Sequence, residues 1–229
     1  MHIKNLHKLY DDLYNQSSQK ILNDDYAVDL NIDNPADKRF GITLVIRPEI
    51  ETKNKIQDFL NELKKTEPEQ YYYSNPDLHI TALSIISCYE EFNLAAINVN
   101  DYSEIITKSL ESLSEFEIEF KGITASDAAI MIQGYPKTET LNQIRENLRN
   151  NFGKSSLQKS IDSRYPLTTA HITALRFRQK LNDTSQFINC IEKYRNHDFG
   201  TSKISTLELV YNDWYQREKI VQKLAEFKI

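Results

Sequence analysis

The sequence predicts an α+β protein built from two pseudo-symmetric strand-helix-strand halves, whose antiparallel sheets face a central groove. Two observations predict this architecture. The pentapeptide HITAL occurs at 79–83 and again at 171–175. The segment at 48–60 also aligns without gaps on 136–148, with identical residues at six of the thirteen positions. Self-similarity over whole segments indicates a duplicated structural unit, so each half should repeat the same order of elements.

Each half begins with a short apolar strand and continues into an amphipathic helix. The runs at 41–47 and 128–133 are apolar and of strand length. Pro48 and Pro136 follow them and suit the first turn of a helix, where the missing N–H costs no hydrogen bond. A polar loop then leads from each helix to a second strand, which carries HITAL. Apolar residues recur at helical spacing in both helices, at Ile56, Phe59, Leu60 and Leu63 and at Leu141, Ile144, Leu148 and Phe152.

Hydrophobic periodicity assigns the segments outside this frame. It predicts strands at 116–124 and 204–212, helices at 103–113 and 185–194, and either state at 218–229. The N-terminal 22 residues have one apolar face and predict an added amphipathic helix. We therefore divide the chain into a helical extension at 1–38 and a single bilobal domain at 39–229. Its halves cover about 39–125 and 126–229, and strands can be exchanged between the lobes.

The composition is that of a globular protein that acts on a small ligand. Apolar residues make up 40% of the chain and charged residues 27%, as in ordinary globular proteins. The net charge of −5 argues against broad contact with duplex nucleic acid and favours a nucleotide or one RNA end. The two cysteines form no C-x-x-C pair, and neither a long apolar run nor a secretory signal occurs. We therefore expect a cytoplasmic monomer without membrane or protein partners.

The repeated HITAL places a histidine and a hydroxyl on one face of each strand. Because side chains alternate along a strand, His79 shares a face with Thr81, and His171 with Thr173. Imidazoles titrate near neutrality, so one can act as general base and the other as general acid on a phosphodiester. Threonine hydroxyls can donate to phosphate oxygens, and the scheme requires no metal and no cofactor. A lone histidine in a strand is more often structural, but here the flanks of the two copies have diverged while the pentapeptide has not.

Two H-x-T motifs on a duplicated strand-helix-strand frame resemble the two-histidine (2H) phosphoesterase superfamily, in its bacterial RNA ligase-like, cyclic phosphodiesterase branch. The resemblance covers the chain from about residue 39 to the C-terminus. It implies that His79 and His171 are the catalytic acid and base and that Thr81 and Thr173 hold the phosphate. It also implies a substrate-binding arginine a few residues after the second motif, where Arg176 stands. Simple alternation points Arg176 away from His171 unless the strand bulges.

The resulting hypothesis is a metal-independent phosphoric diester hydrolase that acts on the 2′,3′-cyclic phosphate of a nucleotide or RNA end. A first alternative is hydrolysis of cyclic or 2′-5′ linked oligonucleotide signals, or of RNA 3′ ends. A second is a nucleotide-binding module without turnover, although the presence of both histidines and both threonines argues against it. Tyr135 and Tyr165 are candidates for stacking on a nucleobase, because they lie near the second-half elements expected to line the groove.

Overall fold

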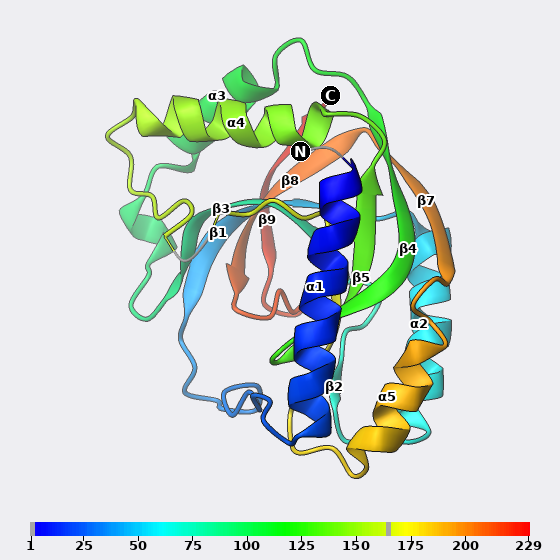
Figure 1. Cartoon of the computed structure of the whole chain (residues 1–229). Helices are drawn as coiled ribbons and strands as arrows, with labels where there is room; N and C mark the ends of the chain where they lie inside the picture. The colour runs from blue at the N-terminus through cyan, green and yellow to red at the C-terminus, as the bar shows by residue number, and fades with distance from the viewer. Residues whose placement is uncertain (1–2, 164–165) are drawn as a thin grey trace.

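The computed structural model describes residues 3–163 and 166–229, which form helices around a curled antiparallel sheet (Figure 1). The strands are β1 (Phe40–Ile46), β2 (Tyr71–Tyr72), β3 (Ile80–Tyr89), β4 (Phe116–Ser126), β5 (Ala129–Pro136), β6 (Ile172–Arg176), β7 (Asp198–Ile204), β8 (Thr206–Asp213) and β9 (Gln222–Lys228). The helices are α1 (Ile3–Leu22), α2 (Ile50–Lys64), α3 (Val99–Leu110), α4 (Thr140–Gly153) and α5 (Thr184–Glu192), with a 3₁₀ turn η1 (Leu94–Ala96). The predicted α+β class is confirmed.

The two expected sheets are joined into one. The strand order is β7-β4-β5-β6-β3-β1-β8-β9, and the short β2 pairs with β6. The lobes meet where Ile80 pairs with Ile172, directly after the two motif histidines. β8 and β9 come from the C-terminal end of the chain yet extend the lobe of β1 and β3, whereas β4 extends the lobe of β5 and β6. The groove therefore lies within one curled sheet, and both HITAL strands lie at its centre.

Each duplicated helix packs against the opposite half. α2 follows β1 in the chain but packs against β7 and α5, while α4 follows β5 but packs against α3 and β3. Figure 1 shows these two helix pairs as separate groups on the outside of the sheet. Because each half supplies the helix that covers the other, the apolar face of neither half is buried by its own residues alone. The two halves are therefore joined by these helices as well as by the sheet.

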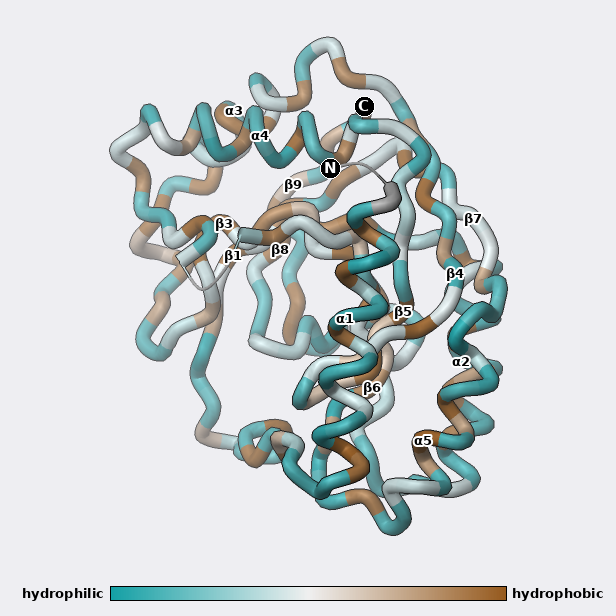
Figure 2. Tube along the Cα trace, viewed as in Figure 1, coloured by the Kyte–Doolittle hydropathy of each residue, from teal (hydrophilic) through white to brown (hydrophobic). Residues whose placement is uncertain are grey.

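The helix phase predicted from apolar spacing is confirmed by burial. The eight residues that predicted the two amphipathic helices are all nearly inaccessible to solvent: Ile56, Phe59, Leu60, Leu63, Leu141, Ile144, Leu148 and Phe152. Figure 2 shows hydrophobic and hydrophilic residues alternating along the outer helices, as expected of helices with one buried face. Within residues 3–163 and 166–229, no helix combines the length and hydropathy needed to cross a bilayer.

The N-terminal helix supports the strand that carries the second motif. The buried Tyr10 hydroxyl donates to the Gly134 carbonyl at 3.2 Å and accepts from the backbone N–H of Ala170 at 3.3 Å. Ala170 directly precedes His171. Position 134 requires glycine, since a Cβ there would lie 2.0 Å from the Ala170 carbonyl oxygen. α1 is therefore bonded to the backbone beside a predicted catalytic residue, although it lies outside the duplicated frame.

Replacing Tyr10 with phenylalanine tests this support. Tyr10→Phe should lower the free energy of unfolding by about 1–3 kcal/mol, because buried backbone groups lose their partner. Urea unfolding followed by circular dichroism measures the change. The matched control is Tyr89→Phe, since the Tyr89 side chain is exposed and its hydroxyl meets only the exposed Gln158 amide. Equal stability of the two variants would show that α1 does not brace β6.

Candidate active site

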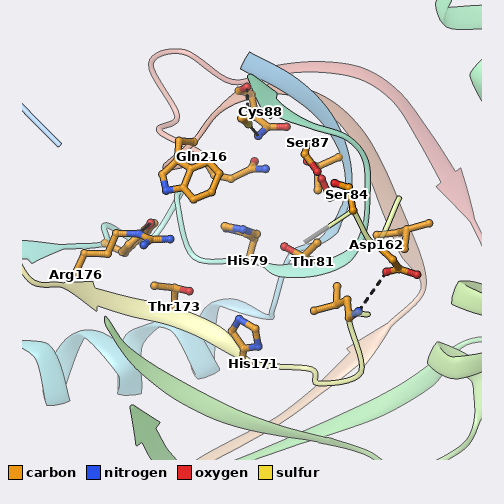
Figure 3. Close-up of a pocket in the computed structure, with 17 residues that line it drawn as sticks. His79, Thr81, Ser84, Ser87, Cys88, Asp162, His171, Thr173, Arg176 and Gln216 are labelled. Atoms are coloured by element: carbon orange, nitrogen blue, oxygen red, sulfur yellow. Dashed lines mark hydrogen bonds between the residues drawn. The ribbon is translucent and has the colours of Figure 1, made fainter. Parts of the chain in front are cut away.

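The two motifs line a single cavity at the centre of the sheet (Figure 3). His79 lies directly before β3 and Thr81 within it, while His171 lies directly before β6 and Thr173 within it; all four line the cavity. All four residues singled out from the repeat are thus brought together. The cavity wall continues beyond the motifs to residues of the loop before β6 and of the end of β8.

A β-bulge interrupts the alternation of β3 inside the first motif. Leu44 of β1 pairs with Leu83, but the next residue, Val45, pairs with Thr81, so Ala82 has no counterpart. Ala82 and Leu83 are consecutive and both buried. An extra residue of this kind bends the strand and shifts the following side chains to the other face.

The second motif contains the same bulge at the equivalent residue. Ile130 of β5 pairs with Leu175, but Met131 pairs with Thr173, which leaves Ala174 unpaired in the ladder. Ala174 and Leu175 are again consecutive and both buried. The bulge is therefore a property of the pentapeptide in both copies.

Because of the bulges, the side chain three positions after each threonine lies on the cavity side of its strand. These residues are Ser84 on β3 and Arg176 on β6, and both line the cavity. Arg176 thus reaches the site despite the simple alternation that would point it away. Its Nε donates to the Tyr73 hydroxyl at 2.9 Å, which holds the guanidinium in place. Ser84 is uncharged and Arg176 is a cation, so of these two bulged strands only β6 places a positive charge at this position of the cavity.

The two histidines have different hydrogen-bond partners. His79 Nδ1 lies 2.7 Å from the Asp77 carbonyl oxygen. Because a carbonyl only accepts, the neutral His79 ring carries its proton on Nδ1 and leaves Nε2 as an acceptor. His171 Nδ1 lies 2.6 Å from Thr169 Oγ1, a hydroxyl that can donate or accept. His171 therefore keeps a partner in either protonation state.

Burial and nearby cations lower the pKa of both histidines. Burial, followed by the charge of Arg47, lowers the pKa of His79 to about 3. Burial, followed by the charges of Arg145 and Arg176, lowers the pKa of His171 to about 4. Both imidazoles are therefore neutral at physiological pH in the ligand-free protein.

Arg145 supports the site from outside the cavity, and the sequence interpretation missed it. It lies on α4 and is only 1% exposed. Its Nε donates to the Ala82 carbonyl at 2.9 Å, and its Nη2 donates to Thr81 O at 3.0 Å and to Thr169 O at 2.7 Å. One guanidinium thus ties the first bulge to the segment before the second motif. A signal was available, since an arginine stands in the apolar stripe between Leu141 and Leu148.

The residue of α2 that is equivalent to Arg145 of α4 is linked to the second bulge through Tyr73. The offset of 88 between the aligned helices places Gln57 opposite Arg145. Gln57 Nε2 donates to the Tyr73 carbonyl at 2.9 Å, and the Tyr73 N–H donates to the Ala174 carbonyl at 3.0 Å. Both unpaired bulge carbonyls thus accept a hydrogen bond, one from the Arg145 side chain and one from the backbone N–H of Tyr73, the residue after β2.

Tyr135 and Tyr165 are the two tyrosines predicted to stack on a nucleobase. Tyr135 does not line the cavity: it lies under α1 against Leu6 and Tyr10, and its hydroxyl donates to Gln133 Oε1 at 2.5 Å. The prediction for Tyr135 is wrong because α1, which is not part of the duplicated frame, covers that face of β5. Tyr165 lies outside the described residues. Among the described residues, no three His, Cys, Asp or Glu side chains are grouped to hold a metal.

Comparison with known proteins identifies the family. Residues 41–226 match the family described as the AKAP7 2′5′ RNA ligase-like domain. The chain belongs to this family. The AKAP7 2′5′ RNA ligase-like family is part of the 2H phosphoesterase superfamily, so the resemblance inferred from the motifs is confirmed. Membership supports a phosphodiesterase-type activity. No curated protein matches the sequence.

Solved structures share the fold of this AKAP7-type chain. The TT0787 protein of Thermus thermophilus matches with a TM-score of 0.57 and 13% identity, over 82% of this chain and 96% of that one. E. coli LigT in complex with 3′-AMP matches with a TM-score of 0.57 and 12% identity, over 83% and 98% of the two chains. At these identities the likeness establishes the fold alone.

Substitution of Arg145 tests its role as the tie between the motif strands. Arg145→Met should lower the free energy of unfolding by about 2 kcal/mol or more, because three carbonyls lose a charged donor. Arg145→Lys should recover little of this loss, since an ammonium cannot reproduce the planar set of donors. Urea denaturation gives the values. The control is Arg178→Met, which removes only an exposed ion pair with Asp33 and should change little. Equal effects at both positions would contradict the assignment.

The lowered histidine pKa values predict neutral rings in the free protein. Imidazole ¹⁵N shifts should report neutral His79 and His171 at about pH 6, where an ordinary histidine is largely protonated. Inorganic phosphate should raise the pKa of one ring, because an adjacent anion favours the imidazolium. Phosphate binding should then take up a proton, and affinity should fall as the pH rises through the pKa of the bound state. Half-protonation of both free rings near pH 6 would contradict the assigned electrostatics.

Proposed function

We propose that this protein is a metal-independent phosphodiesterase that opens the 2′,3′-cyclic phosphate of a nucleotide or RNA end. The observation that carries this proposal is the convergence of two imidazoles on one cavity, each with a threonine hydroxyl on the same strand face. Arg176 adds a permanent positive charge to the same wall. A general base, a general acid, hydroxyl donors and a cation are the groups that displacement at an anionic phosphorus requires.

The hydrogen bonds support distinct roles for the two histidines. His79 Nε2 accepts a proton from water as the water oxygen bonds to phosphorus, and its Nδ1–H remains on the Asp77 carbonyl. The bond from phosphorus to one ribose oxygen breaks, and that oxygen takes the proton from His171 Nε2. His171 acquires this proton when the phosphate anion enters, while its Nδ1–H donates to Thr169 Oγ1.

The threonines and Arg176 complete the mechanism. Thr81 and Thr173 hydroxyls donate to the non-bridging oxygens, and the Arg176 guanidinium stabilises the negative charge that grows on them. After the product leaves, His79 releases its proton to solvent, which restores the two neutral rings of the free protein. Bonds and protons balance without a bound metal.

Charge and comparison support a nucleotide-sized substrate. The net charge of −5 disfavours long nucleic acids, and LigT has been crystallised with 3′-AMP, ATP and NADP⁺. The family description names a 2′5′ RNA ligase-like domain, which supports a 2′-5′ linked oligonucleotide as the second candidate substrate. The same acid, base and hydroxyls would serve both phosphodiesters.

Kinetics on a substrate panel test the proposal. The protein should hydrolyse 2′,3′-cyclic nucleotides without inhibition by EDTA, and His79→Ala and His171→Ala should each lower kcat/KM by at least about 100-fold. His197→Ala is the matched control, because His197 is exposed and lies outside the cavity. A second substrate, a nucleoside 3′-(4-nitrophenyl phosphate), distinguishes the general acid from the general base. Its leaving group needs no proton, so His171→Ala should be impaired less than His79→Ala.

Three results would each contradict part of the proposal. Wild-type rates in both histidine variants would make the histidines structural. Loss of activity with EDTA, restored by a divalent cation, would overturn the metal-independent mechanism. Equal impairment of both variants on the nitrophenyl ester would overturn the assignment of base and acid.

A further inference from the structure

One side of the cavity carries hydroxyls that the proposed reaction does not use. Thr81, Ser84 and Ser87 follow one another at intervals of three residues along β3, and all three line the cavity. They are half-buried, whereas the residues between them are buried. A regular strand presents every second residue to one face, so this interval of three departs from regular strand geometry.

Repeated bulges in β3 produce the interval. Val45 of β1 pairs with Thr81. Two residues earlier in β1, Thr43 pairs with Ser84, so three residues of β3 span two residues of β1. The register shifts twice more before the strand reaches Tyr89. Because two residues of a strand extend about 7 Å, the hydroxyls form a row with a spacing of about 7 Å that begins at Thr81.

The two serine hydroxyls of this row are available to a ligand. Neither Ser84 Oγ nor Ser87 Oγ has a hydrogen-bond partner among the described residues. Both oxygens reach solvent, because neither belongs to the buried polar atoms that lack a partner. Each hydroxyl can donate one hydrogen bond and accept others. The row therefore offers two unoccupied hydrogen-bonding groups beyond the threonine that is proposed to hold the phosphate.

Asp162 lines the same cavity from the segment before β6. Ser160 holds this segment against β3, since its N–H donates to the Ile85 carbonyl at 2.9 Å and its Oγ accepts from the Ser87 N–H at 2.7 Å. The Arg149 guanidinium binds the carboxylate of Asp162 and lowers its pKa, so the carboxylate is charged at neutral pH. Arg149 itself does not line the cavity. The ion pair therefore presents its negative group to a ligand.

Asp162 and Arg176 divide the cavity by charge. Among the described lining residues, only these two carry a formal charge at neutral pH. Figure 3 shows them on opposite sides of His79 and His171. The Arg176 side suits phosphate oxygens. The Asp162 side combines a carboxylate with two hydroxyls, which accept hydrogen bonds from an uncharged group that bears O–H, whereas the carboxylate repels a second phosphate.

We propose that Ser84, Ser87 and Asp162 form a subsite for the ribose of the substrate, with its 5′ hydroxyl against the carboxylate. A step of about 7 Å from Thr81 to Ser84 lets a ribose reach the serine while its phosphate lies between the histidines. The inference rests on the proposed function for that position of the phosphate. Of the two substrate forms proposed above, it favours a free nucleotide over an RNA end, whose 5′ oxygen carries the next phosphate.

Equilibrium binding to the full chain tests the charge of the subsite independently of turnover. Titration calorimetry should show 3′-AMP binding about tenfold or more tightly than adenosine 3′,5′-bisphosphate, because the carboxylate opposes the 5′ phosphate. Asp162→Asn keeps an oxygen for Arg149 and removes the charge, so the ratio should fall to about threefold or less. The matched control is Asp33→Asn, which changes a carboxylate that is also paired with an arginine but lies outside the cavity. It should leave the ratio unchanged.

A second variant tests the hydroxyl row. Ser84→Ala should weaken 3′-AMP about threefold or more, because a hydrogen bond to the ribose is lost. The same variant should bind inorganic phosphate as the wild type does, since phosphate alone does not extend to Ser84. A damaged fold would instead weaken both ligands together. Ser185→Ala, at an exposed position of α5 outside the cavity, is the control and should change neither affinity.

The outcomes separate the subsite from the reaction. Equal or tighter binding of the bisphosphate, a ratio that Asp162→Asn leaves unchanged, or a parallel loss of both ligands in Ser84→Ala would overturn the subsite. Hydrolysis of cyclic nucleotides together with any of these results would overturn the subsite alone. A preference for 3′-AMP that depends on Asp162, in a protein that hydrolyses no cyclic nucleotide, would support the subsite and overturn the proposed reaction.

Discussion

The bulge inside each HITAL strand is the constraint on which the cavity depends. An inserted residue leaves a backbone carbonyl out of the ladder, and a buried carbonyl without a donor costs about 1–3 kcal/mol. Arg145 supplies the donor to Ala82, and the N–H of Tyr73 supplies it to Ala174. Without these donors the regular register would be favoured, and Ser84 and Arg176 would point away from the histidines. Helix and loop residues far along the chain therefore help determine which side chains line the cavity.

The two halves place the same pair of residues, a histidine and a threonine, in the cavity. The two copies differ in the groups that surround each histidine. Each half places an imidazole and a hydroxyl in the cavity, which a symmetric pair of strands achieves by geometry alone. The roles proposed for the two rings differ because His79 donates to a carbonyl, whereas His171 meets a hydroxyl that accepts from its charged form. The single cation Arg176 lies on the strand of His171, opposite the uncharged Ser84. An acid and a base can thus arise from one ancestral half.

The frame could be predicted from the sequence because it depends on local patterns. The spacing of apolar residues determines which helix face is buried, and the repeated pentapeptide marks the strands that meet. Three features depended on contacts between distant segments. The bulges follow from strand pairing, the face of Tyr135 is covered by an added helix, and Arg145 reaches carbonyls more than sixty positions away. The strand β7 was also missed, since its Asp-Phe-Gly start has the composition of a turn.

In the free protein both imidazoles of the cavity are neutral, so the charged acid that the proposed reaction requires depends on the substrate itself. Burial and the surrounding arginines keep both imidazoles neutral, so the free protein contains a base but no charged acid. In the proposed mechanism, a phosphate anion between the rings offsets those cations and favours protonation of His171, whose Nδ1–H can donate to Thr169 Oγ1. The imidazolium that the proposed reaction needs would therefore form only when a phosphate is in place. A neutral ligand of the same shape would not produce the imidazolium, so under this mechanism the charge of the phosphate itself would distinguish substrates from other small molecules.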